Sequence, residues 1–367
     1  MGLVKFGDYV KEVKINIDRN NNPYEYYVAG DHMDSEDLTI RRKGLFATDD
    51  VGPAFTRLFK PGQILYGSRR TYLKKVAVAD FEGICSNTTF VLETKDENKL
   101  RQRLLPFIIL TDDFTKWSIS KSKGSTNPYI LFSDLANYEF ELPDINKQDE
   151  LVKLLWQAYA TKESYREMIR ATDEMVKSQF IEMFGNNETN PKGFMRKPIS
   201  EVATLINGRA YSAKELLQFG KYRVLRVGNF FSTSDFYYSD LELEPNKYCE
   251  KGDLLYAWSA TFGARIWEEE KVIYHYHIWK VEYDNKLLDK EFLCFLLNEM
   301  TENLKRDTHG STMMHLTKEG MERKQIIIPP IGNQNSFVSL LHQADKSKFE
   351  LKQAIEKIDN VMRALMQ

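Results

Sequence analysis

The sequence lacks the features that mark exported or membrane-bound proteins. It has no run of eighteen apolar residues, so no stretch is long enough to cross a bilayer as a helix. The N-terminus, MGLVKFGDYVKEVK, lacks the apolar core of a signal peptide. The three cysteines, Cys85, Cys249 and Cys294, lie far apart without a CxxC pair, which excludes a disulfide framework and a zinc site of that kind. We therefore expect a cytoplasmic protein without membrane segments.

The overall charge argues against a simple nucleic-acid-binding protein, because the formal net charge of the 367 residues is −2 at pH 7. The charge is uneven, however. Residues 38–75 contain nine Lys or Arg residues against two acids, and residues 207–229 contain five against one. Such runs are usually solvated surface. These two basic runs, however, occupy comparable places in the two halves of the chain. A DNA-binding surface in each half is therefore as good an interpretation as solvated surface.

The strongest signal is an internal repeat. At an offset of 186 residues, positions 124–181 align with 310–367 without a gap and share fourteen identities in fifty-eight positions. Further upstream, PGQILYG (61–67) resembles KGDLLYA (251–257). A period of about 190 residues is far longer than the repeats of solenoid proteins, so the pattern predicts the order module, helix, module, helix.

Each repeat ends in a long helical pattern with a coiled-coil seam. Apolar residues recur at alternating steps of four and three from 147 to about 184 and again from 333 to 366, and neither run contains Pro or Gly. Lys162 and Lys348 interrupt the two seams at the same position, where they are placed to fix the register. We expect the two helices to pack antiparallel on each other. The seam residues are Leu151, Leu155, Ala158, Tyr165, Ile169, Phe337, Leu341, Ala344, Leu351 and Ile355.

The modules combine strand and helix signals. Runs rich in β-branched and aromatic residues, such as YRVLRVGNFF (222–231) and KVIYHYHIWKVEY (271–283), indicate strands. Helical patterns at 100–118 and 290–307 precede the Gly-Ser-Thr triplet of each half. Each module is therefore predicted to be α+β.

Several motifs carry a family resemblance. They are KSKGSTNPYI (121–130), THGSTMMHLT (308–317), KSQFIEMFG (177–185) and the P-x-I-x-x-Q helix entries at 143–148 and 329–334. With them, essentially the whole chain resembles the specificity subunit of type I restriction–modification enzymes. The first module departs from the pattern, since it has no clear counterpart of INGRAYS (206–212).

The resemblance implies an α+β fold in which two pseudo-repeated target-recognition domains are joined by two long antiparallel coiled-coil helices. The expected boundaries are 1–146 for the first recognition domain, 147–185 for the first spacer helix, 195–332 for the second domain and 333–367 for the second helix. It further implies that each domain recognises one half of a split site in double-stranded DNA. The helices would set the spacing and dock two modification subunits, which carry the S-adenosylmethionine chemistry, and a translocase/nuclease restriction subunit would complete a restriction enzyme.

Candidate DNA contacts are basic, aromatic and small hydroxyl residues expected in loops, because Arg pairs bidentately with guanine and hydroxyl groups bind phosphates. In the first module they are Arg41, Arg42, Arg69, Arg70, Lys74, Lys121, Lys123, Ser125 and Thr126. In the second they are Arg209, Tyr211, Lys221, Arg226, Trp258, Arg265, Ser311 and Thr312.

Some of these positions have a structural alternative. Tyr66, Tyr256 and Trp258 also fit half-buried strand residues of a core, and for Tyr66 and Tyr256 we favour that interpretation. The Gly-Ser-Thr triplets are either phosphate-contacting turns or tight turns that need Gly at positive φ. Arg226 is expected to alternate away from the core, and Lys221 is expected to contact phosphate from a loop tip.

Motifs for catalysis are missing. KSKGST (121–126) lacks the spacing of a phosphate-binding P-loop, and TNPYI (126–130) lacks one Pro of the N-P-P-Y signature of amino-methyltransferases. His275 and His277 alternate in a strand-like pattern that puts both imidazoles on one face, but no third metal ligand accompanies them. We expect a structural pair, no catalytic residue and no metal or cofactor on this chain. The alternative is a stand-alone DNA enzyme with a degenerate nuclease or methyltransferase site.

Overall fold

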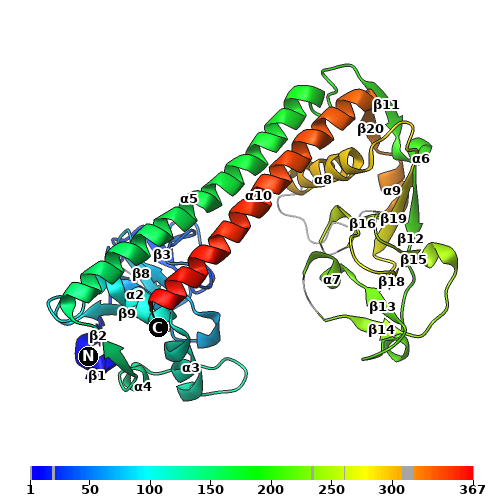
Figure 1. Ribbon diagram of the computed structural model, residues 1–367. Coiled ribbons are helices and arrows are strands. Elements are labelled where there is room, and N and C mark those ends of the chain that lie inside the picture. The colour runs from blue at the N-terminus through cyan, green and yellow to red at the C-terminus, as the bar shows by residue number, and fades with distance from the viewer. Residues whose placement is uncertain (1, 19–20, 233–234, 260, 308–316, 367) are drawn as a thin grey trace. The chain divides into compact units, whose positions relative to one another are not determined.

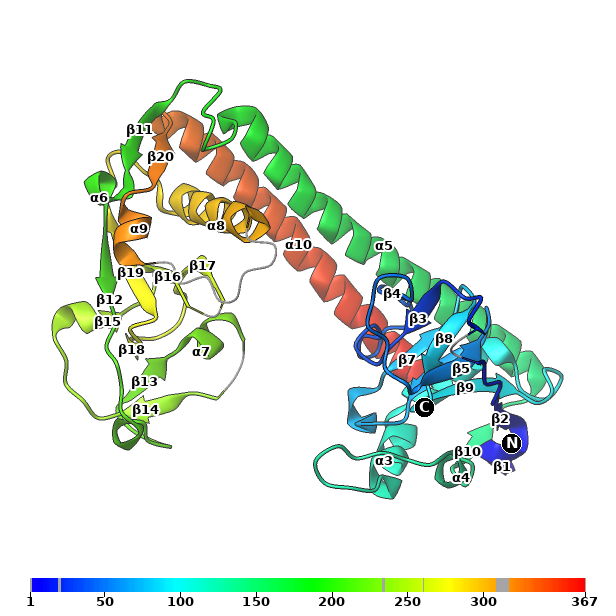
Figure 2. The ribbon, with the colours of Figure 1, turned by 180° about the vertical axis from the view of Figure 1, so that it is seen from behind.

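The computed structural model describes residues 2–18, 21–232, 235–259, 261–307 and 317–366. The chain forms two compact units. Unit 1 comprises the residues up to Glu167 together with those from Leu351 onward, and unit 2 runs from Met168 to Glu350 (Figures 1 and 2). Each unit contains one module and a segment of both long helices.

The long helices are α5 (Ile145–Phe184) and α10 (Ile331–Leu365), each beginning two residues before the predicted start. The α+β fold with two pseudo-repeated modules and two long helices is confirmed. None of the described helices combines the length and apolar composition needed to span a membrane.

Module 1 contains two four-stranded sheets. The first has the order β2 (Val10–Glu12), β9 (Thr89–Thr94), β6 (Ile64–Gly67), β7 (Val76–Val78). The second has the order β4 (Gly44–Leu45), β3 (Tyr26–Val28), β8 (Gly83–Ser86), β5 (Phe55–Phe59). Only β3 and β8 pair parallel among the described strands of these sheets.

Module 2 repeats both sheets strand for strand. The first is β12 (Ala203–Asn207), β19 (Ile278–Tyr283), β16 (Leu254–Ala257), β17 (Gly263–Ile266). The second is β14 (Tyr237–Ser239), β13 (Tyr222–Leu225), β18 (Val272–Tyr274), β15 (Tyr248–Cys249), with β13 and β18 parallel. The internal repeat therefore extends through the modules, where the sequences have diverged.

Smaller elements complete each module. In module 1 they are β1 (Gly2–Lys5) paired with β10 (Glu139–Leu142), α1 (Phe6–Tyr9), η2 (Thr71–Leu73), η3 (Gln102–Leu104), α2 (Leu105–Leu110), α3 (Asp112–Lys121) and α4 (Phe132–Leu135). In module 2 they are β11 (Met195–Pro198) paired with β20 (Gln325–Ile328), α6 (Ile199–Val202), η4 (Ala213–Glu215), α7 (Val227–Phe231), η5 (Pro245–Lys247), α8 (Lys290–Asp307) and α9 (Lys318–Glu322).

Two of these elements differ from the sequence prediction. The single helix expected at 100–118 is broken at Thr111, whose hydroxyl accepts a hydrogen bond from Phe114 N and caps the start of α3. The strand expected over 222–231 ends at Leu225, and Val227–Phe231 form α7 after Arg226.

A buried glutamine fixes the start of α5 to module 1. Gln148 is 1% exposed, and its Nε2 donates to the carbonyls of Pro143 (2.9 Å) and Lys99 (3.0 Å). Its Oε1 accepts from Arg101 N at 3.0 Å. All partners are main-chain atoms, so the link does not depend on the side chains of the module.

Gln334 makes the same three bonds at the start of α10. Its Nε2 donates to the carbonyls of Pro329 (2.7 Å) and Leu287 (2.8 Å), and its Oε1 accepts from Asp289 N (2.8 Å). The P-x-I-x-x-Q motif is thereby explained, because Pro supplies one carbonyl and Gln satisfies two more main-chain groups that would otherwise be buried unpaired.

In each unit the two helix segments lie side by side in opposite directions. In unit 1, Leu155 and Tyr159 of α5 belong to the hydrophobic cluster that also takes in Met362 and Leu365 of α10. In unit 2, the rings of Phe180 and Phe184 lie 5.3 and 5.7 Å from that of Phe337. All ten predicted seam residues are buried or half-buried.

Two reciprocal ion pairs interrupt this seam. Lys162 Nζ lies 2.5 Å from Asp359 Oδ1 in unit 1, and Lys348 Nζ lies 2.8 Å from Asp173 Oδ1 in unit 2. Lys162 and Lys348 are repeat equivalents, and so are Asp173 and Asp359. Each lysine thus pairs with an aspartate of the opposite helix, and that aspartate is the repeat equivalent of the one on the lysine's own helix. Only one antiparallel register of the two helices allows both pairs.

The register pairs predict unequal effects of lysine removal. The Lys162 side chain is 6% exposed, so Lys162→Ala leaves Asp359 partly buried without a cation and should lower the free energy of unfolding by about 2 kcal/mol. Lys348→Ala should cost less than about 1 kcal/mol, because Asp173 is 53% exposed and water replaces its partner. Urea denaturation of both variants measures this. Losses of equal size would show that burial does not govern the two pairs.

Candidate nucleic-acid interface

Two loops of module 1 are hydrogen-bonded to each other at one end of its sheets. Arg70 N donates to Pro128 O at 2.7 Å, and Ile130 N donates to Ser68 O at 2.9 Å. The second loop is itself closed by two hydrogen bonds between Lys123 and Tyr129, of 2.7 and 2.9 Å. The structure thus brings together residues 68–70 and 121–130, which carry six of the nine candidate contacts of this module.

Among these candidates, Arg69 and Arg70 are exposed and form no ion pair with any described residue. Lys121 is exposed with its Nζ 4.7 Å from the centre of the Trp117 ring, and Lys123 pairs with Asp134 at 3.1 Å. Arg70 has a positive φ of 49°, an uncommon conformation for a non-glycine residue that is enriched at functional sites. Arg69, Arg70 and Lys121, which have no acidic partner among the described residues, form a cationic surface that we name the module 1 basic edge.

The Gly-Ser-Thr triplet forms the tip of this edge. Gly124 adopts φ +88°, which a tight turn requires and which favours glycine. Ser125 and Thr126 are both exposed, so their hydroxyl groups are also accessible to a phosphate. The equivalent Ser311 and Thr312 lie outside the described residues.

Three other candidates of module 1 are occupied by acidic partners. Arg41 pairs with Asp37 (2.6 Å) and with Glu163 of α5 (2.5 Å), and thus ties the module to the helix. Arg42 pairs with Asp34 at 2.5 Å.

Lys74 lies between Asp112 (2.8 Å) and Glu36 (3.1 Å). Burial alone would lower its pKa, but the hydrogen bonds to both carboxylates raise it above the usual value. Arg41, Arg42 and Lys74 are therefore not part of the basic edge.

In module 2 the candidates gather around the turn His275–His277. This segment is not the continuous strand that the sequence suggested, because β18 ends at Tyr274 and β19 begins at Ile278 in the other sheet. The expectation that both imidazoles share one strand face was therefore wrong. The rings of His275 and His277 instead lie 4.6 Å apart across the turn.

Main-chain hydrogen bonds hold this turn from three sides. His275 N donates to Leu225 O (2.9 Å), and Tyr276 N donates to Arg209 O (3.1 Å). Trp258 N donates to His277 O (3.0 Å). The turn is therefore rigidly placed beside Arg209 and Trp258, two residues that sequence analysis selected without it.

Arg209 and Tyr211 lie on one side of the turn. Arg209 pairs with Glu215 at 2.6 Å, and hydrogen bonds from Arg209 and from Ser212 lower the pKa of Glu215 to about 2. Tyr211 is half-buried with its ring 6.3 Å from that of His275, and burial raises the pKa of its hydroxyl group. Burial, His277 and Arg226 lower the pKa of His275 to about 4, so its imidazole is neutral at physiological pH.

Arg226 and Trp258 lie on other sides of the turn, whereas Arg265 lies on the edge strand β17. Arg226 is exposed, follows β13 directly and lies 5.4 Å from the ring of Tyr237, and it forms no ion pair with a described residue. Trp258 stacks at 5.7 Å on Trp279 and donates its indole N–H to Tyr276 O (2.8 Å), so it is a half-buried support of the turn. Arg265 is exposed and donates to Phe230 O at 2.9 Å.

Lys221 is not brought to this cluster. It precedes β13, whereas Arg226 follows it, so the two residues lie at opposite ends of the strand. Lys221 is also paired with Glu242, and this hydrogen bond raises its pKa. Its place at the other end of β13 and its ion pair argue against the phosphate contact that the sequence suggested for Lys221.

The tyrosines shared by the two repeats are core residues, as expected. Tyr66 and Tyr256 are 2% and 1% exposed and stack on Phe90 and Trp279, respectively.

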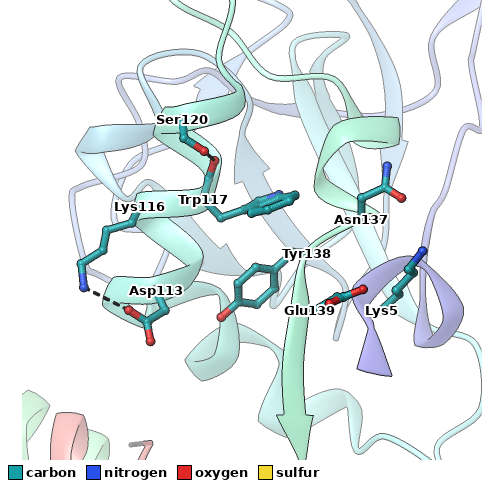
Figure 3. Close-up of a pocket in the computed structure, with 8 residues that line it drawn as sticks. All are labelled: Lys5, Asp113, Lys116, Trp117, Ser120, Asn137, Tyr138 and Glu139. Carbon is teal, nitrogen blue, oxygen red and sulfur yellow. Dashed lines mark hydrogen bonds and ion pairs between the residues drawn. The ribbon is translucent and has the colours of Figure 1, made fainter. Parts of the chain in front are cut away.

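A pocket of about 640 Å³ lies between α3 and β10 of module 1 (Figure 3). Its charges are of both signs: Lys116 pairs with Asp113 at 3.0 Å, and Lys5 and Glu139 are partners in the β1–β10 register. The indole N–H of Trp117 is already donated to a main-chain carbonyl. The pocket therefore lacks the net positive charge of the basic edge. No group of three or more His, Cys, Asp or Glu side chains suited to a metal ion occurs among the described residues.

Comparison with known families assigns this architecture. Residues 11–169 and 191–359 match the type I restriction modification DNA specificity domain. The chain belongs to this family. Both matches cover a module and most of the helix that follows it, in agreement with the structural repeat.

Relatives of the specificity domain family include three curated proteins. The EcoDI specificity subunit of Escherichia coli is 29% identical over 111 residues, which are 30% of this chain and 24% of that protein. The MjaVIII specificity subunit of Methanocaldococcus jannaschii is 25% identical over 116 residues, 32% of this chain and 27% of that protein. The EcoBI specificity subunit of Escherichia coli is 20% identical over 181 residues, which are 47% of this chain and 38% of that protein. The matched stretches thus span less than two-fifths of each relative's own length.

Solved structures share the fold over the whole chain. The S subunit of a type I restriction–modification system from M. genitalium aligns with a TM-score of 0.54 at 14% identity, covering 100% of this chain and 94% of that one. A chain from a structure on complex assembly and conformational transition of the type I R-M system aligns with a TM-score of 0.53 at 18% identity, covering 100% and 96%.

Proposed function

We propose that this chain is the DNA sequence-specificity subunit of a type I restriction–modification system, in which each module recognises one half of a bipartite target. One observation carries the proposal: a family-specific module occurs twice with the same sheets, and in both copies basic residues gather at the same end of the parallel strand pair. Arg69 and Arg70 mark this end in module 1, and Arg226 marks it in module 2.

The long helices would set the distance between the two half-sites and dock two modification subunits. The continuous 40 residues of α5 support a rigid spacer. Exposed apolar residues on the helices, away from the seam, support a docking surface. They are Leu154, Met168, Met175 and Ile181 on α5, and Phe349 and Val361 on α10.

In this proposal the chain performs recognition and no chemistry. The modification subunits would bind S-adenosylmethionine and transfer the methyl group, and a restriction subunit would add cleavage where one is present. The assembly would work in the cytoplasm on double-stranded DNA.

The competing function is a stand-alone nuclease or methyltransferase. Incubating the purified chain with DNA and either Mg²⁺ or labelled S-adenosylmethionine separates the two. We expect no turnover by the chain alone and methyl transfer to DNA once the modification subunits are added. Turnover by the chain alone would replace the proposal with the enzyme.

The position of DNA on module 2 is testable with two cations of β13. Arg226→Ala should weaken specific binding by about 1–3 kcal/mol, because an exposed guanidinium without an acidic partner is free to contact DNA. Lys221→Ala should cost less than about 0.5 kcal/mol, since Lys221 is paired with Glu242 at the other end of the strand. Binding of the assembled complex to target duplexes at three salt concentrations measures both. A larger loss of affinity for Lys221→Ala than for Arg226→Ala would indicate that the DNA binds at the opposite end of the sheet.

A further inference from the structure

We propose that two structurally equivalent turns, Ser86–Thr88 in module 1 and His275–His277 in module 2, are the base-contacting elements, with Asn87 and Tyr276 at their tips. This inference rests on the proposed function and names the residues that determine its specificity.

The equivalence follows from strand register. In module 1, Tyr66 of β6 is the strand-register partner of Phe90 of β9. In module 2, its repeat equivalent Tyr256 is the partner of Trp279 in the same way. Counting back from Phe90 and Trp279 aligns Ser86–Thr88 with His275–His277. Both segments connect the second sheet of the module to the first, and Ser86 is the last residue of β8.

The same main-chain hydrogen bond holds both turns. Ser68 N donates to Thr88 O at 3.1 Å, and Trp258 N donates to His277 O at 3.0 Å. Ser68 and Trp258 each lie two residues after the shared tyrosine. The backbone of the turn is therefore a fixed part of the scaffold in both modules.

The cations of each module lie next to its turn. In module 1, Ser68 holds Thr88 and is followed directly by Arg69 and Arg70. In module 2, Leu225 accepts the hydrogen bond of His275 and is followed directly by Arg226. Phosphate contacts of these arginines would bring the tips to the base edges, because such contacts fix the orientation of a protein on the duplex.

The side chains of the two turns differ. The equivalent residues are Ser86, Asn87 and Thr88 in module 1, where Ser86 is buried, and His275, Tyr276 and His277 in module 2. Asn87 is exposed, and Tyr276 is 37% exposed. An asparagine amide can donate and accept two hydrogen bonds with adenine, whereas a tyrosine offers a hydroxyl group and a ring. A fixed backbone with divergent polar tips is what two domains need when they recognise different half-sites.

The test uses Asn87→Ala and Tyr276→Ala in the full chain, assembled with its modification subunits. Binding is measured against the target duplex and a set of duplexes with one substituted base pair each. Matched controls are Asn98→Ala, an exposed Asn beyond the far end of β9, and Phe219→Ala, an 85% exposed ring at the far end of β13. Thermal unfolding of every variant verifies the fold.

We expect each tip variant to lose roughly 5- to 150-fold in discrimination between the correct and the substituted base pair, at one or two positions of a single half-site. The affected half-site should differ between the two variants. Both controls should keep the discrimination of the unmodified chain. Retained discrimination in both tip variants overturns the inference. So does an equal loss of affinity for all duplexes, which would make the turns phosphate contacts. Failure of the proposed function itself has another signature, because the unmodified complex would then show no sequence preference at all.

Discussion

Leu155→Asp is expected to lower the free energy of unfolding of unit 1 by about 3 kcal/mol or more. Leu155 is completely buried in the cluster that joins α5, module 1 and the end of α10. The substitution removes a core side chain and places a carboxylate in an apolar site without a partner, and each change is costly by itself. We also expect weaker assembly with the modification subunits, since the helix pair would separate in this unit.

The neighbouring residue provides a matched control. Leu154 is 46% exposed on the same turn of α5, so Leu154→Asp should change stability by no more than about 0.5 kcal/mol. Urea denaturation of the three proteins, followed by circular dichroism, gives both values. Equal stability of Leu155→Asp and the unmodified chain would show that this seam does not hold the helices together.

Exchange of module 1 for that of a related protein should replace one half of the recognised DNA site and leave the other half intact. One link at the boundary supports such an exchange, because Gln148 bonds only to main-chain atoms, which any module of this fold provides. Bipartite recognition by independent modules predicts a complete switch of one half-site.

The position of the cut should affect stability but not specificity. Asp37 of module 1 accepts hydrogen bonds from Tyr159 (2.8 Å) and Arg166 (3.3 Å) of α5. A chimera exchanged over 1–146 separates these residues from Asp37 and should be less stable than one exchanged over 1–167, which keeps them together. Sequencing of methylated sites for both chimeras checks the switch. Changes in both half-sites would refute independent recognition.

The long helices and their seam could be predicted from sequence because heptad periodicity is local and both copies display it. The register pairs were visible only as two lysines in the seam, since their aspartates lie on the opposite helix. The sequence predicted two repeated modules from the likeness of residues 61–67 and 251–257. It did not predict that their sheets match strand for strand, because strand pairing joins segments far apart in the chain.

The charge count over 38–75 overstated the DNA-binding surface. Most of its cations are neutralised by acids from other segments, as Arg57 is by Glu12 (2.9 Å) and Arg41 is by Asp37. Only three-dimensional pairing distinguishes these arginines from Arg69 and Arg70. The turn His275–His277 was missed for a related reason. Its sequence alternates as in a strand, and it is a turn only because the chain passes there from one sheet of the module to the other.

The most direct test of the central claim is a map of methylated bases across the host genome with and without this gene. We expect a bipartite motif with a fixed spacer to be methylated only when the gene is present, and each half of that motif to change independently when one module is altered. Methylation at the same motif without the gene would contradict the assignment of sequence recognition to this chain.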